Sequence, residues 1–202
     1  MRLLGVLISG RGSNLQSIIN AVRSGQLDAT VAVVISNRGD AAGLRRARDA
    51  GIETVCLQPH DHADRDAYDR ALVQTLRDRR VDLVCLAGFM RIVGPALLEA
   101  FPNRILNIHP SLLPAFPGLH AQQQALDHGV RITGATVHLV TSVMDDGPIV
   151  AQAAVPVFDT DTVEALSDRI LIEEHRLYVE AIRIMLEGRW KVSDRRFLRL
   201  PL

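Results

Sequence analysis

The first half of the chain alternates short apolar runs with helical segments, and this alternation restricts the possible folds more than any other feature. The apolar runs cover residues 3–9, 31–35, 54–57 and 81–87. The segments between them, residues 15–24, 41–50 and 64–79, carry apolar side chains at helical spacing. Apolar strands joined by amphipathic helices form parallel sheets that helices cover on both faces. The pattern predicts an α/β fold: a Rossmann-like, open, mostly parallel sheet with helices on both faces.

The second half is less regular. Its expected elements are strands over residues 104–109, 133–140 and 148–157, a short helix over 121–128, and a long helix from about 162 to 187. Asp161, followed three residues later by Glu164, forms a capping-box pattern at the start of the long helix. The chain has no internal repeat or evident linker. We therefore predict a single domain over residues 1–202, built in two halves, 1–100 and 101–202.

Composition and charge exclude several classes of protein. The chain carries 23 basic and 23 acidic residues, so its net charge does not favour nucleic acid or an anionic membrane as a partner. No apolar run approaches the length of a membrane span, and no signal-peptide pattern is present. Cys56 and Cys85 each lie inside an apolar run, which predicts buried thiols in a reducing compartment. We expect a cytoplasmic protein.

An amide and an imidazole lie together at the end of an expected strand. Asn107 and His109 are two positions apart, so their side chains share one face of the strand. Pro110 cannot donate to a sheet and marks the end of the strand. Open α/β sheets bind ligands at the carboxyl ends of their strands. An amide donor beside an imidazole suits acyl chemistry, because both can stabilise an oxyanion and the imidazole can move a proton.

A glycine-containing turn joins the first strand to the first helix. Gly10 and Gly12 let the backbone approach an anion, and the helix N-terminus after them offers N–H groups and a favourable dipole. Leu15 stands where a dinucleotide site would have its third glycine, and the second strand ends without an acidic residue. The pattern therefore favours a site for a single phosphate; a tight strand-to-helix turn is the structural alternative.

Three carboxylates are candidates for the site. Asp145 lies in a loop after an expected strand and could orient and charge His109, although such a residue more often forms a turn. Asp146 is an alternative for that role. Glu174 falls on the apolar stripe of the long helix, where a carboxylate needs either an internal salt bridge or a ligand.

The remaining histidines are weaker candidates. His60 and His62 resemble a metal-binding tract but have no third ligand at a recognisable spacing. His120 could flank a site at the start of a helix. His138 lies in an expected strand and is predicted to be a hydrogen-bonded core residue.

Several segments together resemble the formyltransferases that use formyltetrahydrofolate. The resemblance covers nearly the whole chain and is carried by residues 8–16, 86–92, 107–114, 117–120 and 145–148. The Asn-x-His pattern with a later Asp is shared with a deformylase. The Gly-Ser-Asn loop and the Pro-Gly-Leu-His segment are similar to the phosphoribosylglycinamide formyltransferase branch, which acts in purine synthesis.

The resemblance implies a role for each candidate residue. Asn107, His109 and Asp145 would be catalytic. Glu174 would bind ribose hydroxyls, and the phosphate would be held by Gly12, Ser13 and Asn14. The formylfolate site would be lined by Asn107, Arg65, Met90, Arg91, Ile92 and Val93. The first half would then bind the phosphate, and the second half would bind folate and catalyse.

The implied reaction moves the formyl group of 10-formyltetrahydrofolate to the amine of glycinamide ribonucleotide, without a metal, in a monomer or homodimer. Ala115 and Leu171 differ from the residues that the family often has at these positions. We expect these differences to affect substrate affinity more than activity. A formyltetrahydrofolate hydrolase would use the same trio, but such enzymes usually carry an additional N-terminal domain, whereas this chain begins at its first strand. A non-enzymatic nucleotide-binding module is the alternative from another class.

Overall fold

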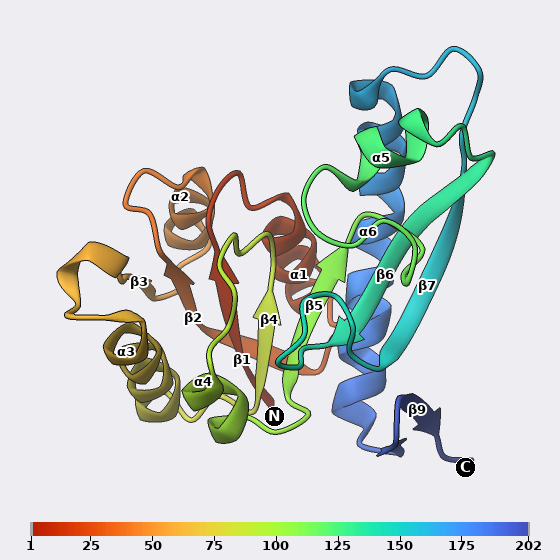
Figure 1. Ribbon diagram of the computed structural model, residues 1–202. Helices are drawn as coiled ribbons and strands as arrows, with labels where there is room; N and C mark the ends of the chain where they lie inside the picture. Colours follow the sequence, from red (N-terminus) through yellow and green to blue (C-terminus); the bar gives the residue numbers. More distant parts are fainter. Residues whose placement is uncertain (1, 202) are drawn as a thin grey trace. The chain divides into compact units, whose positions relative to one another are not determined.

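The computed structural model describes residues 2–201 and divides into two compact units, with the boundary between Asn107 and Ile108. Figure 1 shows strands and helices alternating through the first unit, and a long helix behind two long strands in the second. Over residues 2–201, no helix has the length and apolar character needed to cross a membrane.

The first unit is a parallel sheet. Its strands are β1 (Arg2–Ile8), β2 (Ala29–Ser36), β3 (Thr54–Cys56), β4 (Leu83–Leu86) and the first part of β5 (Ile105–His109). They lie in the order β3-β2-β1-β4-β5, and every pair is parallel. The connections are α1 (Ser13–Arg23), α2 (Ala42–Asp49), the 3₁₀ turn η1 (Pro59–Asp61), α3 (Arg65–Asp78) and α4 (Pro95–Ala100). The predicted α/β fold is confirmed.

Helices cover both faces of this sheet. A side-chain carbon added at Gly5 of β1 would lie 2.5 Å from Leu76 of α3, so α3 packs directly on that position. A carbon added at Gly43 of α2 would lie 2.5 Å from Ile8 of β1. Positions 5 and 8 are an odd number of residues apart and face opposite sides. The strand between them, buried on both faces, forms the core of the unit.

The second unit pairs two antiparallel strands and packs them on a long helix. It contains α5 (Ala121–Asp127), β6 (Ile132–Leu139), β7 (Ile149–Pro156), α6 (Val163–Glu187), β8 (Trp190–Ser193) and β9 (Arg196–Arg199). β6 and β7 pair from Ile132–Pro156 to His138–Ile149, and α6 packs along both strands. The β8–β9 hairpin was not predicted, because each of its strands is only four residues long.

Two local predictions were wrong. Cys56 is exposed, because β3 is a short strand at the edge of the sheet, whereas Cys85 in the central strand β4 is buried. The N-cap of α6 is Thr162, whose side chain accepts from the Ala165 N–H at 3.2 Å. Asp161 instead holds the Arg169 guanidinium through two hydrogen bonds of 2.7 Å.

Candidate active site

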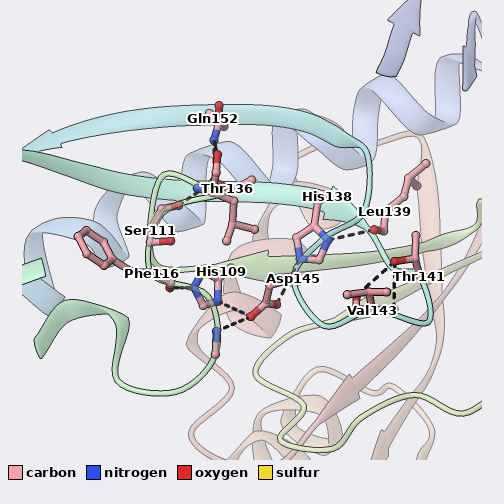
Figure 2. Close-up of polar contacts among 12 residues, drawn as sticks. His109, Ser111, Phe116, Thr136, His138, Leu139, Thr141, Val143, Asp145 and Gln152 are labelled. Carbon is pink, nitrogen blue, oxygen red and sulfur yellow. Dashed lines mark hydrogen bonds and ion pairs between the residues drawn. The ribbon is translucent and has the colours of Figure 1, made fainter. Parts of the chain in front are cut away.

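The best-defined polar cluster of the second unit surrounds the Asp145 carboxylate. Asp145 lies in the loop between β6 and β7, and one carboxylate oxygen is 3.4 Å from Nδ1 of His109 at the end of β5. Its other oxygen is 3.6 Å from Nε2 of His138 on β6. The Gly118 N–H donates to the carboxylate at 2.8 Å. Figure 2 shows the two rings on either side of the carboxylate, so a single buried anion contacts both imidazoles.

The surroundings keep Asp145 ionised. Burial alone would raise the pKa of the Asp145 carboxyl, but the interactions with His138, the Gly118 N–H and the charge of His109 outweigh it. The net effect holds this pKa below its ordinary value. Asp146, the alternative partner for His109, turns to Arg195 and forms two hydrogen bonds of 2.5 and 2.6 Å with its guanidinium.

Both nitrogens of the His109 ring face acceptors. Nε2 lies 2.8 Å from the Phe116 carbonyl oxygen, so it must carry a proton to donate. Nδ1 faces the Asp145 carboxylate, and a lone pair there would repel the anion. The doubly protonated, cationic ring is the form that satisfies both neighbours. His109 is also 95% buried, so a positive charge on its ring would lie next to the Asp145 carboxylate in a region of low dielectric constant.

A buried hydrogen-bond network fixes the segment that follows His109. The Thr136 hydroxyl donates to the Ser111 carbonyl at 2.7 Å and accepts from the Leu113 N–H at 3.0 Å. The Gln152 amide donates to the Leu113 carbonyl at 2.8 Å and to the Thr136 hydroxyl at 3.0 Å. Ser111 donates in turn to the Ala115 carbonyl at 2.5 Å. β6 and β7 thus position the backbone that carries the Phe116 carbonyl.

Asn107 lies two residues before His109 on β5, and its backbone is registered against Leu86 of β4. Alternation along the strand points the two side chains to the same side. Asn107 is half-buried. An amide N–H donor therefore lies next to the imidazole along the strand.

The glycine turn of the first unit is built at the start of α1. Gly12 precedes the helix with φ of 72°, a left-handed conformation that favours glycine. A side-chain carbon on Gly12 would lie 2.7 Å from the Gly43 backbone, so α2 also excludes one. The Gly43 N–H donates to the Gly10 carbonyl at 3.0 Å, and Arg46 donates to the Arg11 carbonyl at 2.9 Å.

The first turn of α1 contains Ser13 and Asn14, both predicted to bind phosphate. Ser13 is half-buried and Asn14 is buried. N–H groups in a first turn have no acceptor one turn back, and the helix dipole favours an anion there. In the described chain this turn carries no acidic residue and receives no capping hydrogen bond from a side chain. The turn therefore offers backbone donors to an anion.

The segment predicted to line the formylfolate site follows β4. Arg65, at the start of α3, donates to the Ile92 carbonyl at 3.0 Å, and the Arg91 guanidinium lies 5.0 Å from the centre of the Tyr68 ring. Met90 and Ile92 expose 70% and 59% of their surface, whereas the Val93 side chain is buried. The segment thus presents two large apolar side chains to solvent.

Asp69 supports this segment and was not singled out from the sequence. Its buried carboxyl accepts a hydrogen bond from the Gly94 N–H, and a side-chain carbon on Gly94 would overlap it. Burial raises the pKa of the Asp69 carboxyl, although the nearby positive charges of Arg65 and Arg91 oppose the shift. The signal in the sequence was an Asp on the inward face of an amphipathic helix, beside Tyr68.

Glu174 lies on the buried face of α6 between Ile170 and Leu177, as its spacing predicted. Its side chain is 8% exposed, so its charge needs compensation from protein groups or from a ligand. His60 and His62 lie at or next to η1. Within residues 2–201, no three His, Cys, Asp or Glu side chains are grouped to hold a metal ion.

The chain matches the family model described as formyl transferase over residues 1–182, which leaves the β8–β9 hairpin outside the match. This match covers most of the sequence. The chain belongs to the formyl transferase family.

Relatives of this formyl transferase include proteins named for transfer of a formyl group and one named for its removal. Phosphoribosylglycinamide formyltransferase of Escherichia coli is 47% identical over 189 residues, which are 94% of this chain and 89% of that protein. Glycinamide ribonucleotide transformylase 1 from Symbiobacterium toebii has 58% identity and a TM-score of 0.98, with 100% of this chain and 95% of that chain covered. A formyltetrahydrofolate deformylase from Pseudomonas syringae has 28% identity and a TM-score of 0.91, with 99% of this chain and 66% of that chain covered.

Thr136→Val should destabilise the protein and slow its turnover. Valine keeps the shape but leaves the buried Leu113 N–H and Ser111 carbonyl without their partner, which costs about 2 kcal/mol. Denaturant unfolding gives the stability. Thr133→Val, on the opposite face of β6, is the matched control for turnover. Normal turnover and stability in Thr136→Val would contradict the role of the network.

Asp145→Asn should reduce stability at neutral pH and progressively less in acid. The folded-state pKa of Asp145 lies below its ordinary value of 3.8, so the ionised carboxylate stabilises the folded state. That contribution is complete above the unfolded pKa and is lost as pH falls through the folded pKa. Urea unfolding of both proteins from pH 7 to pH 3 measures the difference. A difference in the free energy of unfolding that stays constant or grows in acid would contradict the lowered pKa of Asp145.

Proposed function

We propose that this chain transfers the formyl group of 10-formyltetrahydrofolate to the amine of glycinamide ribonucleotide, giving formylglycinamide ribonucleotide in purine biosynthesis. The observation that carries the proposal is the buried His109–Asp145 pair at the end of β5, two residues after Asn107. Membership of the formyl transferase family and the names of the relatives support the choice of substrates.

In this proposal the amine attacks the formyl carbon, and negative charge develops on the formyl oxygen. The cationic His109 ring and the Asn107 amide supply N–H donors for that oxygen. Each such donor typically lowers the barrier by roughly 3 kcal/mol. The attacking nitrogen must lose a proton and the departing folate nitrogen must gain one. The charged ring and water are the groups available to relay it.

His109 has to exchange one of its present partners for the formyl oxygen. Nδ1 faces a charged carboxylate that is itself held by His138 and Gly118, whereas Nε2 donates to the neutral Phe116 carbonyl. The bond to a neutral acceptor in a loop is the weaker of the two. We therefore assign the Nε2 proton to the formyl oxygen, with Asp145 keeping the ring charged and oriented throughout the reaction.

The other assignments follow from charge and chemical type. The backbone donors of the Gly12-Ser13-Asn14 turn suit the phosphate of the ribonucleotide. The buried Glu174 carboxylate would accept hydrogen bonds from ribose hydroxyls. The exposed Met90 and Ile92 side chains, with Arg65, Arg91 and the backbone of Val93, would contact formylfolate, whose tail is anionic.

A substrate-omission assay tests the reaction itself. The enzyme is mixed with 10-formyltetrahydrofolate, with and without glycinamide ribonucleotide, and loss of the formyl group is followed together with formation of the formylated ribonucleotide. Amine-dependent loss with matching product supports the transferase. Equal loss without the ribonucleotide would indicate a hydrolase, which the deformylase relative makes the competing activity. No turnover would favour a binding module.

His109→Ala should lower kcat by at least ~100-fold, because both an oxyanion donor and the proton-relaying group are lost. The KM for each substrate should change much less. Steady-state kinetics measure both, and circular dichroism checks the fold. His60→Ala removes an exposed imidazole from η1 and serves as the control. Turnover close to wild type in His109→Ala would rule out this mechanism.

Ser13→Trp should raise the KM for glycinamide ribonucleotide about tenfold or more, because an indole would crowd the proposed phosphate position at the start of α1. Such a loss corresponds to about 1.4 kcal/mol of binding. The KM for formylfolate should stay near wild type. Ser24→Trp, at the opposite end of α1, controls for the bulk of the new side chain. A selective effect on formylfolate would mean that the phosphate loop is misassigned.

A further inference from the structure

The loop that carries Asp145 is tied to the β8–β9 hairpin by its next residue. Both oxygens of the Asp146 carboxylate accept hydrogen bonds from the Arg195 guanidinium, at 2.5 and 2.6 Å. This two-point geometry fixes direction as well as distance. The pair joins residues 49 positions apart in the sequence. It therefore connects a loop of the candidate active site to an element that the proposed reaction does not otherwise use.

Internal hydrogen bonds of the Asp145 loop join Thr141 and Val143: the Thr141 hydroxyl donates to the Val143 carbonyl at 3.2 Å and accepts from the Val143 N–H at 3.4 Å. Asp145 itself has φ of 53°, a left-handed conformation that is unfavourable for a residue with a side chain. Ser142, Val143 and Met144, which precede it, are exposed and bury no apolar anchor. A backbone held in an unfavourable conformation persists only where its surroundings enforce it. The contacts of the Asp145 carboxylate with His109, His138 and Gly118 hold this conformation from one end, and the Asp146–Arg195 pair holds the next residue.

The hairpin is a firm support for such a tie. Trp190 donates from its indole to the Met185 carbonyl of α6 at 3.1 Å and stacks on Phe197 with ring centres 5.2 Å apart. The Leu200 N–H donates to the Arg189 carbonyl at 2.8 Å, which closes the base of the hairpin on the end of α6. Arg195 occupies the turn between the two strands, at the tip of this anchored element.

We propose that Arg195 is a positioning residue for catalysis: through Asp146 it holds the loop in the conformation that places the Asp145 carboxylate against His109. Only the kinetic effect expected from this inference rests on the proposed function. The Arg195 and Asp146 side chains are 69% and 40% exposed, and exposed pairs contribute little to global stability. The contribution of the pair is therefore expected in the geometry of the loop rather than in the stability of the fold.

Kinetics of Arg195→Ala and Asp146→Asn test the proposal. Each variant should lower kcat by about tenfold, because displacing a catalytic group by a fraction of an ångström is costly. The melting temperature and the KM for glycinamide ribonucleotide should stay near wild type. Arg196→Ala removes the same charge from the neighbouring residue and should leave kcat unchanged. An unchanged kcat in Arg195→Ala, or an equal loss in Arg196→Ala, would overturn the proposal.

A double-mutant cycle tests whether Arg195 and Asp146 affect kcat through their contact with each other. If the two residues act through one another, Arg195→Ala combined with Asp146→Asn should be no slower than either single variant. Additive losses would overturn the proposal. The charge-swapped protein, Asp146→Arg with Arg195→Asp, should recover part of kcat, and Arg195→Lys should recover less than full activity because lysine cannot make the two-point contact.

Amide hydrogen exchange provides a readout that does not depend on activity. Residues 141–147 should exchange faster in Arg195→Ala and Asp146→Asn than in wild type or Arg196→Ala. If the wild type has no transferase activity but the loop still loosens, the proposed function fails and the structural tie stands. Unchanged exchange in an active enzyme would overturn the tie and leave the proposed function intact.

Discussion

The second unit is organised around one buried anion, the Asp145 carboxylate. It lies between the His109 and His138 rings and accepts a hydrogen bond from the Gly118 N–H. Strand ends and loops that are distant in sequence therefore converge on a single charge. A buried carboxylate would be costly without these partners. Because these partners compensate it, the carboxylate can orient the His109 ring, and the proposed formyl transfer depends on that contact.

Side-chain hydrogen bonds hold the backbone around this anion. Thr136 and Gln152 on the paired strands satisfy the polar groups of the segment after His109, and the Asp146–Arg195 pair holds the loop on the other side of the anion. A buried polar network with missing partners would destabilise the fold more than an apolar core would. Loss of one partner is therefore expected to disturb its neighbours. The second unit uses side-chain hydrogen bonds where the first unit uses regular alternation of strand and helix.

In the first unit, glycines let other parts of the chain pack closely against the backbone. Gly12 turns the chain into α1 and lets α2 pack against the loop, and Gly94 leaves room for the buried Asp69 carboxyl. The two glycines precede α1 and α4, one in the proposed phosphate loop and the other at the end of the proposed formylfolate segment.

The sequence by itself determined the elements whose physics is local. Continuous apolar runs specified the parallel strands, and apolar side chains at a period of about 3.6 residues specified the helices. The buried position of Glu174 followed from the apolar stripe of α6. The sequence also placed His109 and a carboxylate in the same half of the chain. It predicted Cys56 to be buried and Asp161 to cap α6, because edge strands and exact helix starts depend on neighbours that local patterns do not contain.

Tertiary structure decided which groups meet. Asp145 and Asp146 are adjacent and chemically identical, and only the path of the loop turns the first toward His109 and the second toward Arg195. His138, expected to be a core residue, is buried and also faces Asp145, because the strand brings it there. Contacts between residues far apart in sequence depend on the packing of whole elements, and no spacing along the chain encodes them.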